Sequence, residues 1–159
     1  MRELVKLFLK TDIKMNMQTG FGGDSSAMAE QYMKTMFDLM VPVMENSVVL
    51  AAEYSKACGR DIILPEDLEY ATKYCAMNTV GQNVGTLFPE IYNEEEEEEE
   101  EEVGIEEVPQ EDCPPFVKYY GDEEKFISMN QAYDNWENWV PQNPAEQMLK
   151  NAINSNEHT

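Results

Sequence analysis

The side chains that most often perform chemistry are scarce in this chain. His158 is the only histidine, so histidine-based catalytic triads and histidine-rich metal sites are excluded by inventory. Cys58 and Cys75 have no plausible base partner and are expected to be buried, whereas Cys113 precedes two prolines and is a candidate exposed thiol. We therefore expect no enzyme activity and no cofactor.

Carboxylates are the one abundant functional group. The 159 residues include 32 Asp and Glu against 11 Lys and Arg, a net charge of -21. Nine consecutive glutamates, Glu94–Glu102, begin a tract that reaches Asp112 without a basic residue. The tract could hold Ca²⁺ weakly, but it lacks the spacing of an EF-hand loop, so no metal site is expected. Because like charges repel and offer nothing to bury, residues 93–112 are predicted to be an extended acidic linker.

The overall charge excludes several classes of partner. Nucleic acids and anionic membranes both attract cations, so direct DNA binding and membrane binding are not expected. No apolar run approaches the roughly 20 residues that span a bilayer. Leu4–Leu9 is too short for a secretory signal and is interrupted by a lysine. Three cysteines without C-x-x-C spacing favour a reducing compartment, so the protein is expected to be intracellular and not secreted.

The linker divides the chain into an amino-terminal module, 1–92, and a carboxy-terminal tail, 113–159. Apolar spacing in the module predicts a short helix over 2–10 and a long helix from about Ser25 to about Cys58. Pro42 interrupts the long helix while the apolar stripe keeps its phase, so a kink is expected there. Gly59 ends this helix, a short β-favouring run follows at 61–64, and Pro65 opens a helix to about Asn78.

This order of elements resembles the histone fold. Residues 44–54 are similar to the second half of the central helix of that family, and residues 57–71 to its second loop and third helix. The most recognisable part is Gly59-Arg60, then Ile62-Ile63, then Glu66-Asp67 before an aliphatic residue. The predicted fold class is therefore all-α: a histone fold (short helix, long kinked helix, short helix) with an acidic linker and a helical carboxy-terminal tail.

Two structural features follow from the resemblance. Arg60 and Asp67 match the intrachain Arg–Asp clamp of the family, and such a pair can form two hydrogen bonds across a tight loop. The alternative is a solvated arginine beside an aspartate that begins a helix. The resemblance also implies an obligate dimer with a second histone-fold chain, identical or different, because the long helix is apolar over too wide a face to be left exposed.

The predicted partner interface follows the long helix and the short strand. Eight of the eleven methionines lie in residues 1–44, where they suit either an adaptable partner surface or a core of the chain itself. The interface residues are predicted to be Met36, Met40, Met44, Val48, Ala51, Ile62 and Ile63.

The charge of the module differs from that of DNA-packaging histones. Residues 24–80 contain nine acidic and four basic side chains, and Arg60 in the second loop is followed at once by Asp61. Histones wrap DNA by presenting arginines and backbone amides to phosphates. A DNA-wrapping role is therefore not expected.

The tail is predicted to form two helices with aromatic side chains. Apolar residues from Phe126 to Trp136 recur at helical spacing after Asp122–Glu124, and Asn143-Pro144-Ala145-Glu146 is typical of a helix start. Helices this short are unstable alone in water, so they must dock onto the module or onto a partner. The expected anchors are Phe126, Tyr133, Trp136 and Trp139.

The layout of histone fold, poly-Glu run and Trp-rich tail is similar to small histone-fold proteins of large DNA viruses. The first hypothesis is a histone-fold dimerisation subunit that acts through protein–protein contacts in a nuclear, transcription-related or viral assembly. The alternatives are a virion component that cements capsid proteins, and an acidic histone chaperone or DNA mimic that binds basic proteins through Glu94–Glu102. The expected location is the nucleus, a viral factory or the virion.

Overall fold

The computed structural model describes residues 25–91 and 106–156, and within these ranges all regular secondary structure is helical, which confirms the all-α part of the predicted class. The β-favouring run does not form a strand there: Leu64 has an extended backbone, but no neighbouring strand of the described chain pairs with it. The α-helices are α2 (Ser25–Ala57), α3 (Pro65–Asn78), α4 (Glu124–Asn135) and α5 (Pro144–Asn156), and the 3₁₀ turns are η1 (Pro89–Ile91), η2 (Gln110–Asp112) and η3 (Trp136–Asn138).

Some predicted features lie outside the described residues. These are the short helix over 2–10, the greater part of the acidic linker including Glu94–Glu102, and His158.

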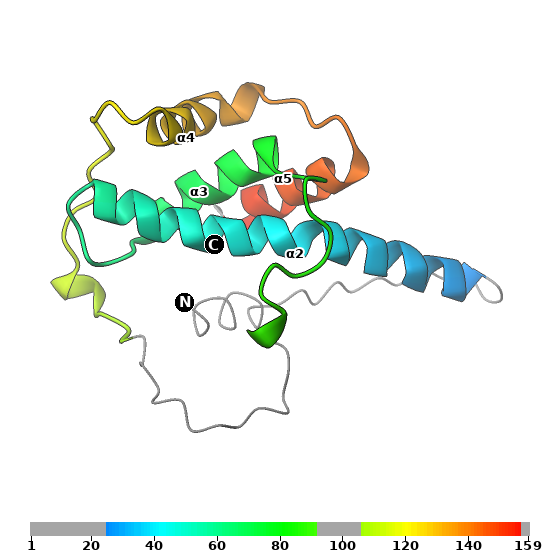
Figure 1. The fold of residues 1–159 in the computed structure, drawn as a ribbon. Helices are drawn as coiled ribbons and strands as arrows, with labels where there is room; N and C mark the ends of the chain where they lie inside the picture. The colour runs from blue at the N-terminus through cyan, green and yellow to red at the C-terminus, as the bar shows by residue number, and fades with distance from the viewer. Residues whose placement is uncertain (1–24, 92–105, 157–159) are drawn as a thin grey trace.

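Helix α2 continues through Pro42 without interruption (Figure 1). Proline has no N–H group, so the carbonyl of Asp38, four residues earlier, loses its helical donor. The Gly85 amide, from the segment after α3, donates to that carbonyl at an N–O distance of 2.7 Å. A distant part of the chain therefore satisfies the backbone group that Pro42 leaves unpaired. The bend expected at this position stays a prediction.

The end of α2 closes with a tight turn at Gly59. This glycine has a φ of +81°, in the left-handed region that side chains with a Cβ rarely adopt. The Gly59 amide donates to the carbonyl of Lys56 and the Arg60 amide to that of Ser55, both at 2.9 Å. These two bonds form a Schellman motif, which reverses the chain and leads it into α3.

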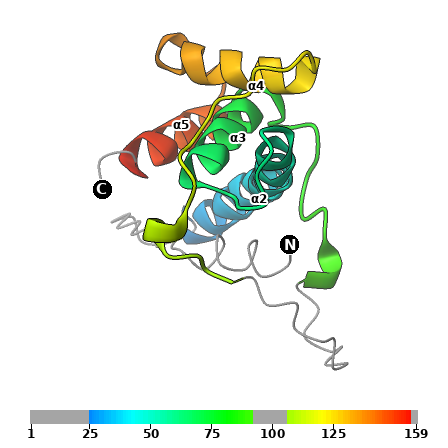
Figure 2. The ribbon, with the colours of Figure 1, turned by 90° about the vertical axis from the view of Figure 1, so that its left-hand side faces the viewer.

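The helices form layers with α3 in the middle. Figure 2 looks along α2 and shows α3 between it and α4, with α5 beside α3. One group of core residues joins α2 and α3 to η3 and α5, and comprises Met40, Val43, Cys75, Ala76, Trp136 and Leu149. A second group joins α2 and α3 to α4, and comprises Ala51, Tyr54, Tyr70, Ala71, Phe126 and Met129. The tail therefore docks onto the chain's own module, and the two share one core.

The start of α5 has the capping that its sequence predicts. The Glu146 amide donates to the side-chain oxygen of Asn143 at 2.9 Å. The carboxylate of Glu146 in turn accepts from the backbone of Gln142 at 2.6 Å. In a capping box this second bond would involve the backbone N–H of Asn143 itself. Here its donor is the residue before Asn143, so the bond stabilises the loop that leads into the helix.

Helix α2 is also long and apolar enough, by length and composition alone, to cross a membrane. Its most apolar 18-residue window has a mean hydropathy of 1.3, and the expectation that no apolar run approaches the length of a bilayer span stays a prediction. Half of that window is buried inside the chain, and core helices of soluble proteins share this property.

Candidate functional site

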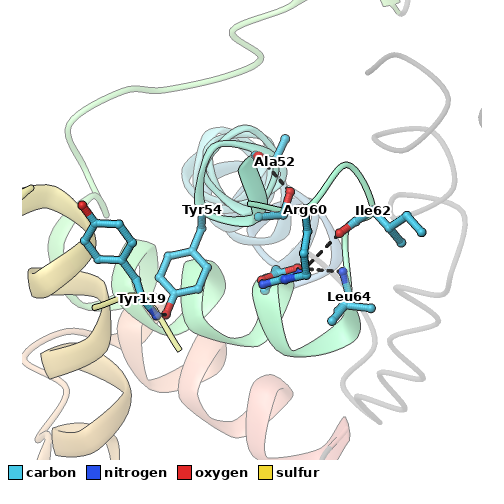
Figure 3. A network of polar contacts seen from close by, with 8 residues as sticks. Ala52, Tyr54, Arg60, Ile62, Leu64 and Tyr119 are labelled. Atoms are coloured by element: carbon cyan, nitrogen blue, oxygen red, sulfur yellow. Dashed lines mark hydrogen bonds and ion pairs between the residues drawn. The ribbon is translucent and has the colours of Figure 1, made fainter. Parts of the chain in front are cut away.

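Arg60 and Asp67 form a bidentate ion pair across the loop between α2 and α3. Figure 3 shows Arg60 beside Ile62 and Leu64 of this loop. Arg60 Nη1 lies 2.5 Å from Asp67 Oδ2, and Arg60 Nη2 lies 2.7 Å from Oδ1. The Leu64 amide donates to Asp67 Oδ2 at 2.7 Å, and Arg60 Nη1 donates to the Ile62 carbonyl at 3.3 Å. Asp67 is fully buried and Arg60 is 9% exposed. The pair thus ties the whole loop to the first turn of α3.

The surroundings of this pair favour the charged guanidinium. Hydrogen bonding to Asp67 raises the pKa of Arg60, although burial opposes this. The Phe116 ring centroid lies 5.6 Å from Arg60 Cζ, and Nε has no hydrogen-bond partner among the described residues. Burial raises the pKa of the neighbouring Cys58 thiol more than Arg60 lowers it. Cys58 is therefore a protonated, unreactive thiol near pH 7, and the arrangement is structural.

Tyr54 is the centre of a buried polar network that joins α2 to the tail. Its hydroxyl donates to Asn130 Oδ1 at 2.6 Å and accepts from the Tyr119 amide at 3.0 Å. Asn130 Nδ2 closes the triangle by donating to the Tyr119 carbonyl at 2.9 Å. Figure 3 shows Tyr54 and Tyr119 beside each other at the end of α2. Burial raises the pKa of Tyr54 to about 12, so the hydroxyl stays protonated and available as a donor.

Aromatic stacking holds α4 against α3. The rings of Tyr70 and Tyr133 are nearly parallel, with centroids 4.1 Å apart and an interplanar angle of 5°. Phe126 is buried and packs edge-on against Tyr54 at 5.9 Å. Lys73 of α3 lies 4.5 Å from the Tyr133 ring centroid and pairs with Glu69 at 2.8 Å. Tyr133 and Phe126, two of the four predicted anchors, thus dock onto the module.

The two tryptophans dock the end of the tail. Trp136 is 1% exposed and lies in the core group that α2, α3 and α5 share. Its indole N–H donates to Asn154 Oδ1 at 2.8 Å. Trp139 is partly buried against the same group, and its carbonyl accepts from Lys150 at 2.6 Å. All four predicted anchors therefore contact the chain itself.

The predicted partner-interface residues are divided between the core and the surface. Met36, Met40, Val48 and Ala51 are buried within the chain. Their apolar character is explained by the chain's own packing, so they do not form an exposed interface in this structure. The partly exposed members are Met44, Ile62 and Ile63.

An exposed apolar surface lies further toward the start of α2. The first turns of this helix extend beyond α3, α4 and α5 (Figure 1). Met28 is 74% exposed, Tyr32 48% and Phe37 44%. Exposed Val84 and Leu87 belong to the segment whose Gly85 binds α2 beside Phe37. Met28 and Tyr32 lie four residues apart and share one side of the helix, and we refer to these two residues as the α2 patch. Phe37, five residues after Tyr32, lies on another side of the helix.

Sequence reasoning missed the buried carboxylate of Glu45. This side chain is fully buried and accepts from Thr86 Oγ1 at 2.6 Å and from the Leu87 amide at 2.7 Å. It fixes the segment after α3 along α2. A signal was present, since Glu45 lies four residues after Val41 and three before Val48, on the buried face of the helix. Asn130, four residues after Phe126, carries the same signal in α4.

The cysteine thiols in the described part of the chain are not activated. Burial raises the pKa of Cys75 to about 11, and the Cys113 thiol contacts the Pro109 carbonyl at 3.5 Å. Within residues 25–91 and 106–156, no group of three potential ligands could hold a metal ion. An open depression of about 470 Å³ lies over α3 and the tail, lined by Glu69, Lys73, Tyr133, Trp136 and Glu137. Lys73, the cation in this lining, pairs with Glu69.

Comparison with known proteins adds no relative. No protein family, curated protein or solved structure matches this chain.

Proposed function

We propose that the chain is a non-enzymatic interaction subunit with a histone-fold-like core, which pairs with a second histone-fold chain in a nuclear or viral assembly. The α2 patch carries this proposal. Its two large apolar side chains lie exposed on one side of the projecting start of α2, where burial by a partner would be favourable.

The loop between α2 and α3 supports the histone-fold part of the proposal. A long helix closed by a Schellman turn, a bidentate Arg60–Asp67 pair and a helix that begins at Pro65 are the features on which the resemblance depends. The same bonds give the loop a single rigid geometry, which a partner-binding loop requires.

The interface that we propose differs in extent from the one that the sequence predicts. It consists of the α2 patch, because Met36, Met40, Val48 and Ala51 are buried in the chain itself. A partner of either kind, identical or different, would contact one side of α2 at Met28 and Tyr32, which are four residues apart. This is the helix-in-groove mode of recognition.

Sedimentation velocity tests the proposal on the full chain, alone and mixed with purified core histones. Tyr32→Lys adds one positive charge to the α2 patch, and Glu30→Gln changes the charge by the same amount at an exposed position on the opposite side of the helix. We expect Tyr32→Lys to weaken association by about tenfold or more and Glu30→Gln to leave it unchanged.

Two outcomes would contradict the proposal. One is a chain that stays monomeric under every condition. The other is histone binding that Tyr32→Lys leaves unchanged but that disappears when Glu94–Glu102 become glutamine. That result would support the acidic histone chaperone as the function instead.

A further inference from the structure

Two adjacent tyrosines before α4 have very different surroundings. Tyr119 packs against the core group of Tyr54 and Phe126, and its ring centroid lies 5.0 Å from that of Phe126. The Tyr119 hydroxyl accepts from the Glu123 amide at 3.2 Å. Tyr120, in contrast, is 86% exposed, and its hydroxyl has no hydrogen-bond partner among the described residues. The chain thus buries one tyrosine in part and presents the next one to solvent.

The backbone that carries Tyr120 is non-helical but well anchored. Residues 114–120 lie between η2 and α4 and belong to no helix. The Tyr119 amide donates to the Tyr54 hydroxyl at 3.0 Å, and the Tyr119 carbonyl accepts from Asn130 at 2.9 Å. A Cβ added to Gly121 would come within 2.1 Å of the Tyr119 hydroxyl, so the glycine leaves room for that side chain. The contacts of Tyr119 therefore hold the segment that displays Tyr120.

An enzyme that modifies tyrosine needs an accessible hydroxyl on a segment that can enter an extended groove. The other described tyrosines are buried, lie in helices, or both, except for the partly buried Tyr119; they are Tyr32, Tyr54, Tyr70, Tyr74 and Tyr133. Among the tyrosines that the structure describes, Tyr120 is the one that meets both requirements.

Negative charge follows Tyr120 directly in the sequence. The three acids Asp122–Glu124 are all exposed, and none of them forms an ion pair with a described residue. The nearest basic residue in the sequence, Lys118, already pairs with Asp134 at 3.0 Å. The segment around the tyrosine is therefore acidic, and a protein with a basic binding cleft would associate with it faster than one with a neutral cleft.

We propose that Tyr120 is a phosphorylation site for a protein tyrosine kinase with a basic substrate cleft. The co-substrate is ATP: the Tyr120 hydroxyl oxygen forms a bond to the γ-phosphorus, the bond from that phosphorus to the β,γ-bridging oxygen breaks, and ADP leaves. The phenolic proton passes to the catalytic carboxylate of the kinase. The segment before α4 lies at the opposite end of α2 from its projecting start (Figure 1), so the inference does not depend on the proposed function.

Phosphorylation of Tyr120 would add a ligand to the surface without disturbing the core. A phosphate on tyrosine carries about 1.5 to 2 negative charges and three acceptor oxygens. Because the Tyr120 side chain lies outside both core groups, the packing of the helices should remain unchanged. The phosphate instead creates a site for a partner that binds phosphotyrosine through an arginine.

Tandem mass spectrometry of the full chain tests this site after incubation with Mg-ATP and a purified tyrosine kinase that prefers acidic substrates. We expect Tyr120 to be phosphorylated at least about tenfold faster than any other described tyrosine. Tyr120→Phe should remove this product. The matched variant Tyr119→Phe, which loses only the hydroxyl that accepts from Glu123, should leave the rate at Tyr120 unchanged.

Two triple variants with equal net charge test the contribution of the acids. The first combines Asp122→Asn, Glu123→Gln and Glu124→Gln beside the tyrosine. The second combines Glu106→Gln, Glu107→Gln and Glu111→Gln at exposed positions further away in the sequence. We expect the first to lower kcat/KM for Tyr120 by about tenfold and the second to leave it unchanged. Circular dichroism confirms that α4 remains folded in both.

Two results would overturn the proposal. Equal rates at Tyr119 and Tyr120 in the folded chain, or no phosphate on Tyr120, would exclude the site. Equal rates in the two triple variants would exclude a kinase with a basic cleft. Neither result affects the association that Tyr32→Lys tests, so the proposed function can stand or fail separately.

Discussion

Arg60 and Asp67 place two opposite charges in the interior of the loop between α2 and α3. Burying an ion pair costs desolvation energy that the attraction only partly returns, so the pair adds little net stability. Its importance is geometric, since Asp67 also accepts from the Leu64 amide and Arg60 donates to the Ile62 carbonyl. Removing one partner therefore lowers the stability of the fold by much more than the intact pair raises it.

Asp67→Asn tests this asymmetry. We expect the free energy of unfolding to fall by about 3–5 kcal/mol, because the buried guanidinium of Arg60 loses its counter-charge. Urea denaturation followed by circular dichroism measures the change. Asp61→Asn, at the exposed acid next to Arg60, should change stability by no more than about 0.5 kcal/mol. Equal losses in the two variants would show that the buried pairing is not what matters.

Tyr54 makes stability depend on alkaline pH. Burial raises its pKa to about 12, whereas an unfolded tyrosine titrates near pH 10. Below pH 10 both states keep the proton, so the contribution of Tyr54 is fully present. Between pH 10 and 12 only the unfolded chain loses it, so the free energy of unfolding falls by up to about 2–3 kcal/mol.

Urea titrations at pH 9 and pH 11 of the unmodified chain and of Tyr54→Phe measure this dependence. The variant should lose less stability than the unmodified chain over the same interval. Tyr70, whose pKa burial also raises, keeps part of the slope in both proteins. Parallel losses would exclude Tyr54 as the titrating group.

At the scale of elements, the reversal after α2 depends on the backbone of Gly59. Its φ of +81° is strained for any residue with a Cβ, but an added Cβ would meet no atom within 4 Å. Gly59→Ala should therefore destabilise the fold by about 1–2 kcal/mol through conformation alone. Gly59→Asn should cost less, since asparagine tolerates this region better. Thermal unfolding of both variants measures the two losses of stability. A larger loss for Gly59→Asn than for Gly59→Ala would contradict this explanation.

The helix boundaries were predictable because local chemistry determines them. Gly59, Pro65 and Asn143-Pro144 act within a few residues of their own position, and the periodic apolar residues indicate the extents of α2, α3 and α5. Helix α4 is shorter than its apolar spacing predicts, because it ends at Asn135 and a 3₁₀ turn follows over Trp136–Asn138. Pairing across seven residues, as in Arg60 and Asp67, is also short-range. Contacts between residues this close in the sequence can therefore be predicted without knowledge of the tertiary structure.

Contacts between residues far apart in the sequence were not predictable in the same way. Spacing on α2 identifies apolar residues such as Met40 and Ala51, but it cannot tell whether a tail of the same chain or a second chain covers them. The donor that satisfies the Asp38 carbonyl comes from Gly85, and nothing near Pro42 indicates it. The strand expected at 61–64 failed for the same reason, since a strand needs a partner that composition does not supply.

At the scale of the whole molecule, the net charge of -21 should make stability depend on salt. Added salt screens repulsion among the acids more than it weakens exposed pairs such as Lys118–Asp134, which contribute about 0–1 kcal/mol each. We expect the midpoint of thermal unfolding to rise between 20 and 500 mM NaCl, on the order of a few degrees. Replacing Glu94–Glu102 with glutamine should reduce this rise. A midpoint that falls with salt would mean that ion pairs outweigh repulsion.

The shared core also determines when the chain can finish folding during its synthesis. Helices α2 and α3 leave the ribosome first, yet Trp136 and Leu149, which complete their packing, are made about 60 to 70 residues later. At 5–20 residues per second this interval lasts on the order of 3 to 14 seconds. During that time the apolar side of the nascent helices has no covering from its own chain. Messages that end before the codon for Trp136 should therefore yield products that aggregate or engage chaperones.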